Sequence, residues 1–264
     1  MSAAAARHAL ACTLAREAGA LALSFFADRS ALTVETKDTP QDVVSRADRA
    51  VEDLIRARIA EAFPEDAILG EEGGASPGQT GFGWVIDPID GTMPFLSGLP
   101  HWCVAIAITH AGDTVAAATF APVMDTLWEA RAGAGARRDG VALSLTEGPG
   151  LTARMTAIGA SHRTDPAHVA AVIAALMEAG GIFYRNGSGA MMLAQVAEGA
   201  LAGYYEPHMH PWDALGGLLL VSEAGGRTLP FPTGGGRVLA AAPAGFAPLC
   251  RIVGDPAAEV SEGS

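Results

Sequence analysis

The sequence predicts an α/β fold in which an α+β N-terminal half is followed by a C-terminal half of alternating helices and strands. Residues 3–27 and 45–63 carry apolar side chains three and four positions apart, the spacing of amphipathic helices. Short apolar runs separated by turn residues then indicate a meandering sheet, with strands at 84–87, 103–109, 114–122 and 126–132. Farther along, strand and helix patterns take turns, which is the third observation behind the fold class.

The second half is predicted to begin at a cluster of turn-forming residues. Gly148, Pro149 and Gly150 fall where the first set of strands has ended. We therefore expect an N-terminal half at 1–147 and a C-terminal half at 148–264. The elements expected in the C-terminal half are strands at 155–159 and 181–185 and helices at 166–178, 188–199 and 213–224.

Composition and charge narrow the classes of function. Half of the 264 residues are hydrophobic and 17% are charged, which is typical of a globular protein with a substantial core. The net charge of -12 and the lack of a basic cluster argue against nucleic acid or an acidic membrane surface as a partner. Charges interrupt each apolar run before it reaches the ~18 residues of a membrane span. Cys12, Cys103 and Cys250 are far apart, which fits reduced thiols in a cytoplasmic protein.

Acidic residues follow three apolar runs along the chain. They are Glu71 and Glu72 in "ILGEEGG", Asp87 and Asp90 in "WVIDPIDGT", and Asp213 in "HPWDALGG". A carboxylate at the exit of a buried strand is unfavourable unless a positive group meets it. Mg²⁺ takes oxygen ligands from carboxylates, backbone carbonyls and water, so these motifs predict a divalent-cation site.

The backbone between Asp87 and Asp90 suits such a site. Pro88 fixes one dihedral angle, and Gly91 permits a sharp turn that aims the carbonyl of Ile89 at the same ion. An isolated pair of this kind is more often a turn or a helix cap. This pair is not isolated, because other acidic residues lie 16 positions upstream and far downstream.

The order and spacing of these motifs resemble the inositol monophosphatase family, within a superfamily of metal-dependent, lithium-sensitive phosphatases. "DPIDGT" at 87–92 is the most specific signature. "QDVVSRADRAVEDLI" is similar to the family's first Asp-containing helix, and "FPEDAILGEEGG" to its glutamate loop. "GSGAMMLAQVAEG" and "PWDALGGLLLVSEAGG" are similar to its two C-terminal signatures. The resemblance covers nearly the whole chain and implies a layered α/β/α/β/α sandwich of the inositol monophosphatase/fructose-1,6-bisphosphatase type.

The resemblance also implies where metal would bind. Two or three Mg²⁺ ions would lie between the halves, held by Glu71, Asp87, Asp90, Asp213 and the carbonyl of Ile89. The reaction implied is phosphomonoester hydrolysis by a metal-activated water, with no covalent intermediate.

Further roles are carried over from the same motifs. Thr92 would orient or help to deprotonate the attacking water, assisted by Asp48, while Glu72 would support the glutamate loop. The backbone N–H groups of Gly91 and Thr92 would bind phosphate at a helix start. Lys37, the single lysine of the chain, stands where similar proteins carry a lysine near the metal site. Chance placement of that lysine is the alternative.

The alcohol part of the substrate is predicted from fewer residues. Similar proteins contact it through a segment that is here Gly187, Ser188, Gly189 and Ala190, and through a glutamate after the last sheet strand, here Glu206. A carboxylate can accept hydrogen bonds from two sugar hydroxyls. Glu206 therefore favours a small polyol phosphate, with inositol monophosphate as the first candidate.

Other substrates stay open, since the sequence departs from the inositol-type pattern. Pro94 and Ala202 stand where an Asn and an Asp are usual. "FLSGLPHW" at 95–102 is similar to histidinol-phosphate phosphatases, whose substrate brings an ammonium and an imidazole that a carboxylate attracts equally. Histidinol phosphate is the second candidate, and another sugar or nucleotide phosphate is the third. His208 and His210 flank the expected mouth of the site.

A non-catalytic role is a separate hypothesis. Some members of the superfamily serve as regulatory or RNA-machinery binding modules, although the acidic charge speaks against RNA itself. The intact acidic motifs favour an enzyme. Similar proteins are usually homodimers, so the expected partners are a small phosphate monoester and a second copy of the chain, with no nucleic acid and no membrane.

Overall fold

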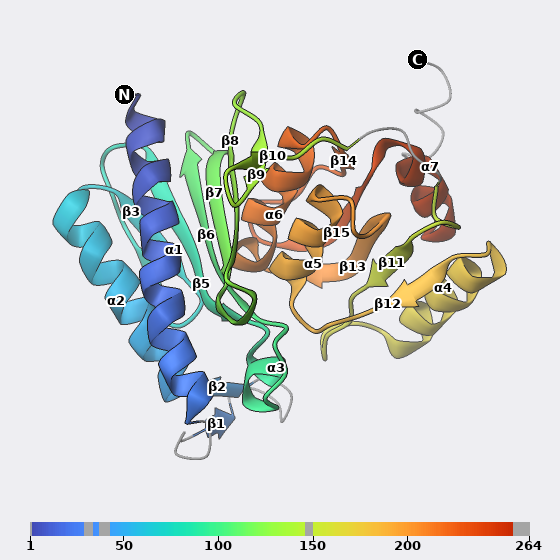
Figure 1. Cartoon of the computed structure of the whole chain (residues 1–264), viewed down its shortest axis with the longest axis horizontal. Coiled ribbons are helices and arrows are strands. Elements are labelled where there is room, and N and C mark those ends of the chain that lie inside the picture. The colour runs from blue at the N-terminus through green and yellow to red at the C-terminus, as the bar shows by residue number, and fades with distance from the viewer. Residues whose placement is uncertain (1, 29–33, 37–42, 146–149, 256–264) are drawn as a thin grey trace.

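The computed structural model describes residues 2–28, 34–36, 43–145 and 150–255. Its elements form five layers, α/β/α/β/α, which follow one another across the molecule in Figure 1. Helices α1 (Ala3–Ala27) and α2 (Arg46–Ala62) cover one face of a large sheet. Helices α5 (Gly189–Ala197) and α6 (Pro211–Glu223) separate that sheet from a smaller one, and α4 (Pro166–Glu178) and α7 (Pro243–Ile252) cover the far side. The predicted fold class and layered architecture are confirmed.

The large sheet has eight strands. In spatial order they are β10 (Val141–Ala142), β9 (Ala136–Arg138), β8 (Thr126–Arg131), β7 (Asp113–Ala121), β6 (Cys103–His110), β5 (Phe82–Asp90), β3 (Ala67–Gly70) and β4 (Gly74–Ser76). Strands β5 to β8 form the predicted antiparallel meander. Strand β3 runs parallel to β5, so both strands end at the same edge of the sheet. Two short helices, α3 (Thr92–Leu96) and η2 (Pro122–Met124), follow β5 and β7.

The small sheet has five strands, in the order β12 (Ile182–Tyr184), β11 (Met155–Ile158), β13 (Gly203–Met209), β15 (Gly236–Ala241) and β14 (Arg227–Thr228). Strand β11 pairs parallel with both of its neighbours, and the other pairs are antiparallel. The expectation that Glu206 follows the last sheet strand is wrong, because Glu206 lies within β13 and two more strands come after it. A separate hairpin pairs β1 (Val34–Thr36) with β2 (Val43–Ser45).

Three apolar cores fill the spaces between the layers. The first lies under α1 and α2 and contains Trp84, which is fully buried as expected of strand core. The third lies between the small sheet and helices α4 and α7. The second core contains Trp128 from the first half of the chain and Tyr204 from the second. The two halves of the chain thus share one apolar core. The boundary predicted at 147/148 lies outside the described residues.

Helix α1 is long and apolar. An 18-residue window within its 25 residues has a mean hydropathy of 1.3, so by length and composition alone the helix could cross a membrane, although Arg16 and Glu17 interrupt its apolar run as expected. In the fold its buried face, which includes Leu14 and Ala18, packs on β6 and β7. Core helices of globular proteins pass the same length and hydropathy test, so this is weak evidence for a membrane span.

Candidate active site

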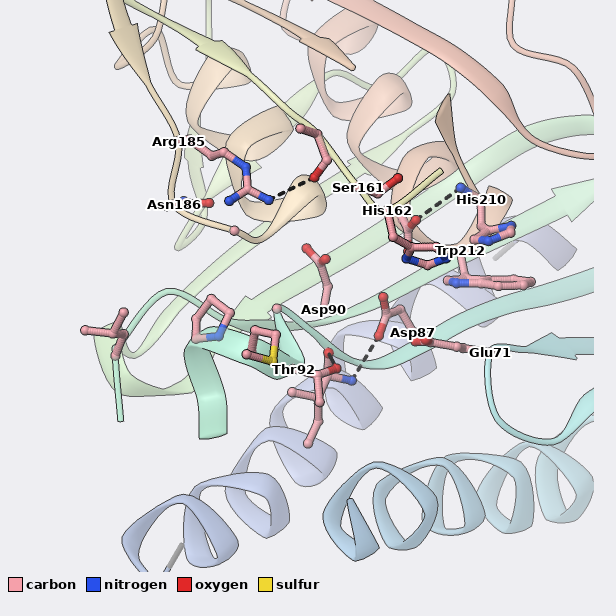
Figure 2. Close-up of a pocket in the computed structure, with 18 of the residues that line it drawn as sticks. Glu71, Asp87, Asp90, Thr92, Ser161, His162, Arg185, Asn186, His210 and Trp212 are labelled. Atoms are coloured by element: carbon pink, nitrogen blue, oxygen red, sulfur yellow. Dashed lines mark hydrogen bonds between the residues drawn. The ribbon is translucent and has the colours of Figure 1, made fainter. Parts of the chain in front are cut away.

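A cavity of about 990 Å³ opens between the two halves of the chain (Figure 2). One side comes from the end of β5 and from α3, and the other from the segments 160–163 and 185–187 and the start of α6. Eight of the predicted site residues line it: Glu71, Asp87, Ile89, Asp90, Gly91, Thr92, Gly187 and Asp213.

An irregularity in β5 turns Asp87 and Asp90 toward the same side of the sheet. In a regular strand, side chains three positions apart point to opposite faces. Here Asp87 pairs with Ala105 and Asp90 with Cys103, so three steps along β5 match two along β6. The extra residue makes a β-bulge. The side chain of Ile89 consequently stays in the first core while both carboxylates face the cavity.

Asp213 reaches the same place from α6. The helix begins after His210, whose backbone N–H donates to Asp213 Oδ2 at 3.1 Å, and Pro211 occupies the first turn, where its missing N–H is not needed. Carboxylate oxygens of Asp87, Asp90 and Asp213 all lie within 4.8 Å of one another. Acidic residues from both halves of the chain therefore converge, as predicted.

These carboxyl groups are electrostatically unfavourable neighbours. Burial raises the pKa of Asp87 well above its usual range, and the charges of Glu71, Asp90 and Asp213 raise it further. Burial, followed by Asp90 and Glu71, raises the pKa of Asp213 in the same way. Burial also raises the pKa of Asp90, although the hydrogen bond from Ser188 opposes the rise. Like charges held together away from water need a positive counter-charge to stay ionised.

The available ligand atoms fit a hard divalent cation. Mg²⁺ binds oxygen atoms at about 2.1 Å in octahedral geometry, so two ligands of one ion lie about 3 to 4 Å apart. Carboxylate oxygens of the three aspartates lie within 4.8 Å of one another, which is near that spacing, and Ile89 and Glu71 line the same cavity. A cation here would supply the positive charge that keeps the carboxylates ionised. The residues thus fit the ions that the sequence predicted.

Asp90 also holds the beginning of α5. Its carboxylate accepts a hydrogen bond from Ser188 Oγ, one from the Gly189 N–H at 3.2 Å and one from the Ala190 N–H at 2.7 Å. Ser188 and Ala190 are buried and line neither cavity, whereas Gly187 faces the large one. This placement therefore does not favour the direct contact of Ser188 and Ala190 with substrate that the sequence predicted. It favours a role in positioning Asp90.

Thr92 lies at the start of α3, beside the acidic cluster. Its Oγ1 is 3.4 Å from Asp48 Oδ1 and 3.3 Å from the carbonyl oxygen of Ile89, and it can donate to either. Gly91 caps α3 with a φ of 96°, and a Cβ there would lie 2.8 Å from the carbonyl oxygen of His101. Glycine is therefore required at 91 for both its conformation and its space.

Glu52, which sequence reasoning missed, holds the backbone of the glutamate loop. Its buried carboxylate accepts hydrogen bonds from the N–H groups of Glu72 and Gly73 at 2.8 Å each, and from Arg56 Nε at 2.6 Å. Glu72 was expected to support this loop, but its own backbone is supported by Glu52. The signal was present in the sequence, because Glu52 follows Asp48 by four residues on the buried face of α2.

A smaller cavity of about 160 Å³ adjoins the large one and is lined by Glu206, Gly189 and His208. The hydroxyl of Tyr204 donates to Glu206. Burial raises the pKa of Glu206 to about 7, although that hydrogen bond opposes the rise. Nδ1 of His208 is buried and has no hydrogen-bond partner among the described residues. The lining of this side cavity is mostly polar and suits a hydroxyl-rich group.

Two arginines that the sequence did not single out line both cavities. They are Arg163 and Arg185, and the guanidinium of Arg185 donates to the carbonyl oxygen of Ala160 at 2.9 Å (Figure 2). Neither arginine belongs to a sequence motif, because only the folded chain brings them to the cavities. Trp212 also lines the cavity and stacks on His210 with ring centroids 4.6 Å apart.

The remaining predicted residue, Lys37, lies outside the described residues. The three cysteines are free thiols, of which Cys103 and Cys250 are buried and Cys12 is partly exposed.

Comparison with known proteins agrees with the fold and the motifs. The family model described as "Inositol monophosphatase family" matches residues 5–249. An inositol-1-monophosphatase of Rhizobium meliloti is 36% identical over 200 residues, 74% of this chain and 75% of that protein. A protein named Nus factor SuhB from Xylella fastidiosa is 38% identical over 220 residues, 82% of this chain and 79% of its own length.

Solved structures give the same result. An inositol monophosphatase from Anabaena superposes with a TM-score of 0.81 at 28% identity, covering 94% of this chain and 95% of the other. The extragenic suppressor protein SuhB of Bartonella henselae superposes with a TM-score of 0.85 at 28% identity, over 91% of this chain and 95% of the other. With the fold, the acidic cluster and the signature motifs in agreement, the chain belongs to the inositol monophosphatase family.

Proposed function

We propose that the chain is a Mg²⁺-dependent phosphomonoesterase that hydrolyses a small polyol phosphate, with inositol monophosphate as the first candidate. The observation that carries the proposal is the convergence of the Asp87, Asp90 and Asp213 carboxylates within 4.8 Å at the wall of a large cavity. The raised pKa values of Asp87 and Asp213 reflect burial and repulsion between like charges, which a bound cation would relieve. Family membership supports phosphatase chemistry.

Bound Mg²⁺ would lower the pKa of water and neutralise charge on the phosphate and the leaving oxygen. The chain's own residues would do the positioning. Thr92 Oγ1, which can donate to Asp48 or to the Ile89 carbonyl, would orient the attacking water. The N–H groups of Gly91 and Thr92 would donate hydrogen bonds to the phosphate. These contacts would do most of the binding, because α3 is only five residues long and its dipole adds little.

The side cavity supports a hydroxyl-rich alcohol. Glu206 opens into it beside His208, and a carboxylate at this point accepts hydrogen bonds from two neighbouring hydroxyls. The same carboxylate would attract the ammonium of histidinol phosphate, which is the second candidate substrate. We further expect a cytoplasmic homodimer, as predicted from the sequence.

A regulatory binding function is the alternative from a different class. It is favoured by the similarity to proteins named Nus factor SuhB, in Xylella fastidiosa and also in Escherichia coli at 34% identity. That name concerns those proteins. For this chain, the net charge of -12 speaks against direct RNA contact, and the complete acidic cluster favours catalysis.

Phosphate release decides between these functions. We would measure turnover of inositol 1-phosphate, histidinol phosphate and a panel of small phosphomonoesters, with Mg²⁺ and with a chelator. Mg²⁺-dependent release that is fastest for inositol 1-phosphate is expected. Faster release from histidinol phosphate would select the second substrate. If a folded sample releases no phosphate from any ester, the regulatory binding function would replace the phosphatase proposal.

A further inference from the structure

A second group of metal-ligating side chains lies away from the cavity. His8 and Cys12 on α1 and Glu129 on β8 each place one ligand atom within 4.8 Å of the other two. None of the three lines either cavity of the candidate active site. We propose that this triad binds a borderline-soft divalent cation, zinc first of all, at a site separate from the acidic cluster.

The fold brings the triad together by simple periodicities. His8 and Cys12 are four residues apart on α1, so their side chains project from the same face of the helix. On β8, Trp128 and Ala130 point into the second core, and Glu129 between them points to the α1 side of the sheet. The triad therefore lies between the first helical layer and the large sheet.

Two of the three distances within the triad match tetrahedral coordination. With Zn–S of about 2.3 Å and Zn–N or Zn–O of about 2.0 to 2.1 Å, ligand atoms of a tetrahedral ion lie about 3.3 to 3.6 Å apart. His8 Nε2 is 3.3 Å from Glu129 Oε2 and 3.6 Å from Cys12 Sγ. The third edge, from Cys12 Sγ to Glu129 Oε2, is 3.1 Å. An ion would need to widen only that edge, by about half an ångström.

The ligand types select the metal. One sulfur, one imidazole nitrogen and one carboxylate oxygen suit zinc, whereas Mg²⁺ requires oxygen ligands throughout. The thiolate and the carboxylate together would balance the charge of the ion. The positive charges of Arg16 and Arg131, which act on Cys12 and His8, would lower the affinity for it. The side chains of His8 and Glu129 are 18% and 21% exposed, so solvent can deliver the ion and fill the fourth position.

The competing explanation is a hydrogen-bonded triad without metal, in which the Cys12 thiol donates to Glu129. Burial and the Glu129 carboxylate raise the pKa of Cys12, so without an ion the thiol keeps its proton. Metal binding would replace that S–H bond by a metal–sulfur bond and release the proton to solvent. The two explanations differ in whether a metal–thiolate bond forms.

Cobalt(II) gives that bond a spectroscopic signature. We would add Co²⁺ to the full-length protein in excess Mg²⁺, which keeps the acidic cluster filled, and follow thiolate-to-cobalt charge transfer in the near ultraviolet. One equivalent is expected to saturate the band. Cys12→Ser should abolish it, and His8→Gln should weaken Co²⁺ binding at least tenfold. Cys250→Ala, which removes a thiol elsewhere, should leave it unchanged.

One further control separates this site from the cavity. Cys103 Sγ lies 3.7 Å from Asp90 Oδ2, so a cobalt ion in the acidic cluster would have a thiol within reach. Asp213→Asn should leave the band intact if Cys12 is its source. Zn²⁺ should also raise the melting temperature of the Mg²⁺-saturated protein, and Cys12→Ser should remove that shift.

A wild-type protein with no cobalt–thiolate band would overturn the proposal. So would a band that survives Cys12→Ser. If Cys12→Ser does not fold, Glu129→Gln serves in its place, because it keeps the thiol and removes a charged ligand. It should weaken Co²⁺ binding at least tenfold, and unchanged binding would contradict the assignment.

Discussion

Ser188 donates its hydroxyl hydrogen to the carboxylate of Asp90 across 98 residues of chain. The bond joins the beginning of α5 to the "DPIDGT" segment, and it links the two halves of the molecule at the candidate active site. The same hydroxyl accepts from the Met191 N–H, so Ser188 is also the N-cap of α5.

Replacing this serine should affect both stability and turnover. Ser188→Ala removes a helix cap and a buried hydrogen bond, so we expect the free energy of unfolding to fall by about 1 to 2 kcal/mol. Turnover should fall as well, because Asp90 loses a partner that orients it. Urea denaturation and phosphate release would measure the two effects.

The chain offers a matched control for that variant. Ser2 caps α1 by accepting from the Ala5 N–H at 3.2 Å, far from the cavity in sequence and with no contact to the acidic cluster. Ser2→Ala should lower stability without changing turnover. Equal turnover in the Ser188 and Ser2 variants would contradict a positioning role for Ser188.

Asp87→Asn should stabilise the metal-free protein while destroying its activity. The pKa of Asp87 is raised, so its ionised form at neutral pH opposes folding, and each pKa unit corresponds to about 1.4 kcal/mol. The asparagine keeps an oxygen for the Ile89 N–H. Melting in a chelator should show the gain, and turnover in Mg²⁺ should drop at least a hundredfold.

Asp113→Asn is the corresponding control, since Asp113 is an exposed aspartate at the start of β7. It should change neither measurement. If the Asp87 variant melted below the wild type in chelator, the carboxylates would not be repelling one another as inferred.

Removal of Mg²⁺ should lower the melting temperature of the wild-type protein. A ligand that binds only the folded state at a hundred times its dissociation constant stabilises it by about 2.7 kcal/mol. The shift should nearly vanish in Asp213→Asn, which lacks one charge of the cluster. A wild-type melting temperature that ignores Mg²⁺ in differential scanning calorimetry would argue against the metal site.

Glu206 should make stability pH-dependent in the metal-free protein. Its folded-state pKa is raised to about 7 from an ordinary value of about 4.5, so the folded protein binds this proton more tightly than the unfolded chain does. The stability linked to that proton is complete below pH ~4.5 and is lost as pH rises through ~7. Glu206→Gln should flatten this part of the profile and be the more stable protein at pH 8. Parallel profiles for the two proteins, measured in chelator, would contradict the raised pKa.

Much of the fold followed from local patterns. Periodicity found both N-terminal helices and the β5 to β8 meander, because each of these elements pairs or packs with a neighbour in sequence. The pairing of β3 with β5 was missed, as were β13 and β15. Strand β13 pairs with β11 and β15, each separated from it by at least one helix, and no local pattern encodes which strand a sheet edge will meet.

The site divides in a similar way. The sequence predicted the carboxylates because several acidic residues follow apolar runs. It did not predict the bulge that aligns Asp87 with Asp90, because the bulge is defined by the pairing of β5 with β6. Glu52 looked like any helical glutamate until its burial was known. Arg163 and Arg185 belong to no motif, and only the folded chain brings them to the cavities.

The position of Asp213 has a consequence for how the protein is made. Its carboxylate completes the acidic cluster, yet it lies on α6, which packs on strands of the large sheet that are synthesised much earlier. During translation, a ribosome-bound chain that stops short of residue 213 contains the whole large sheet and none of the finished centre. Products truncated before residue 213 should therefore be inert toward phosphate esters, because they lack the Asp213 carboxylate.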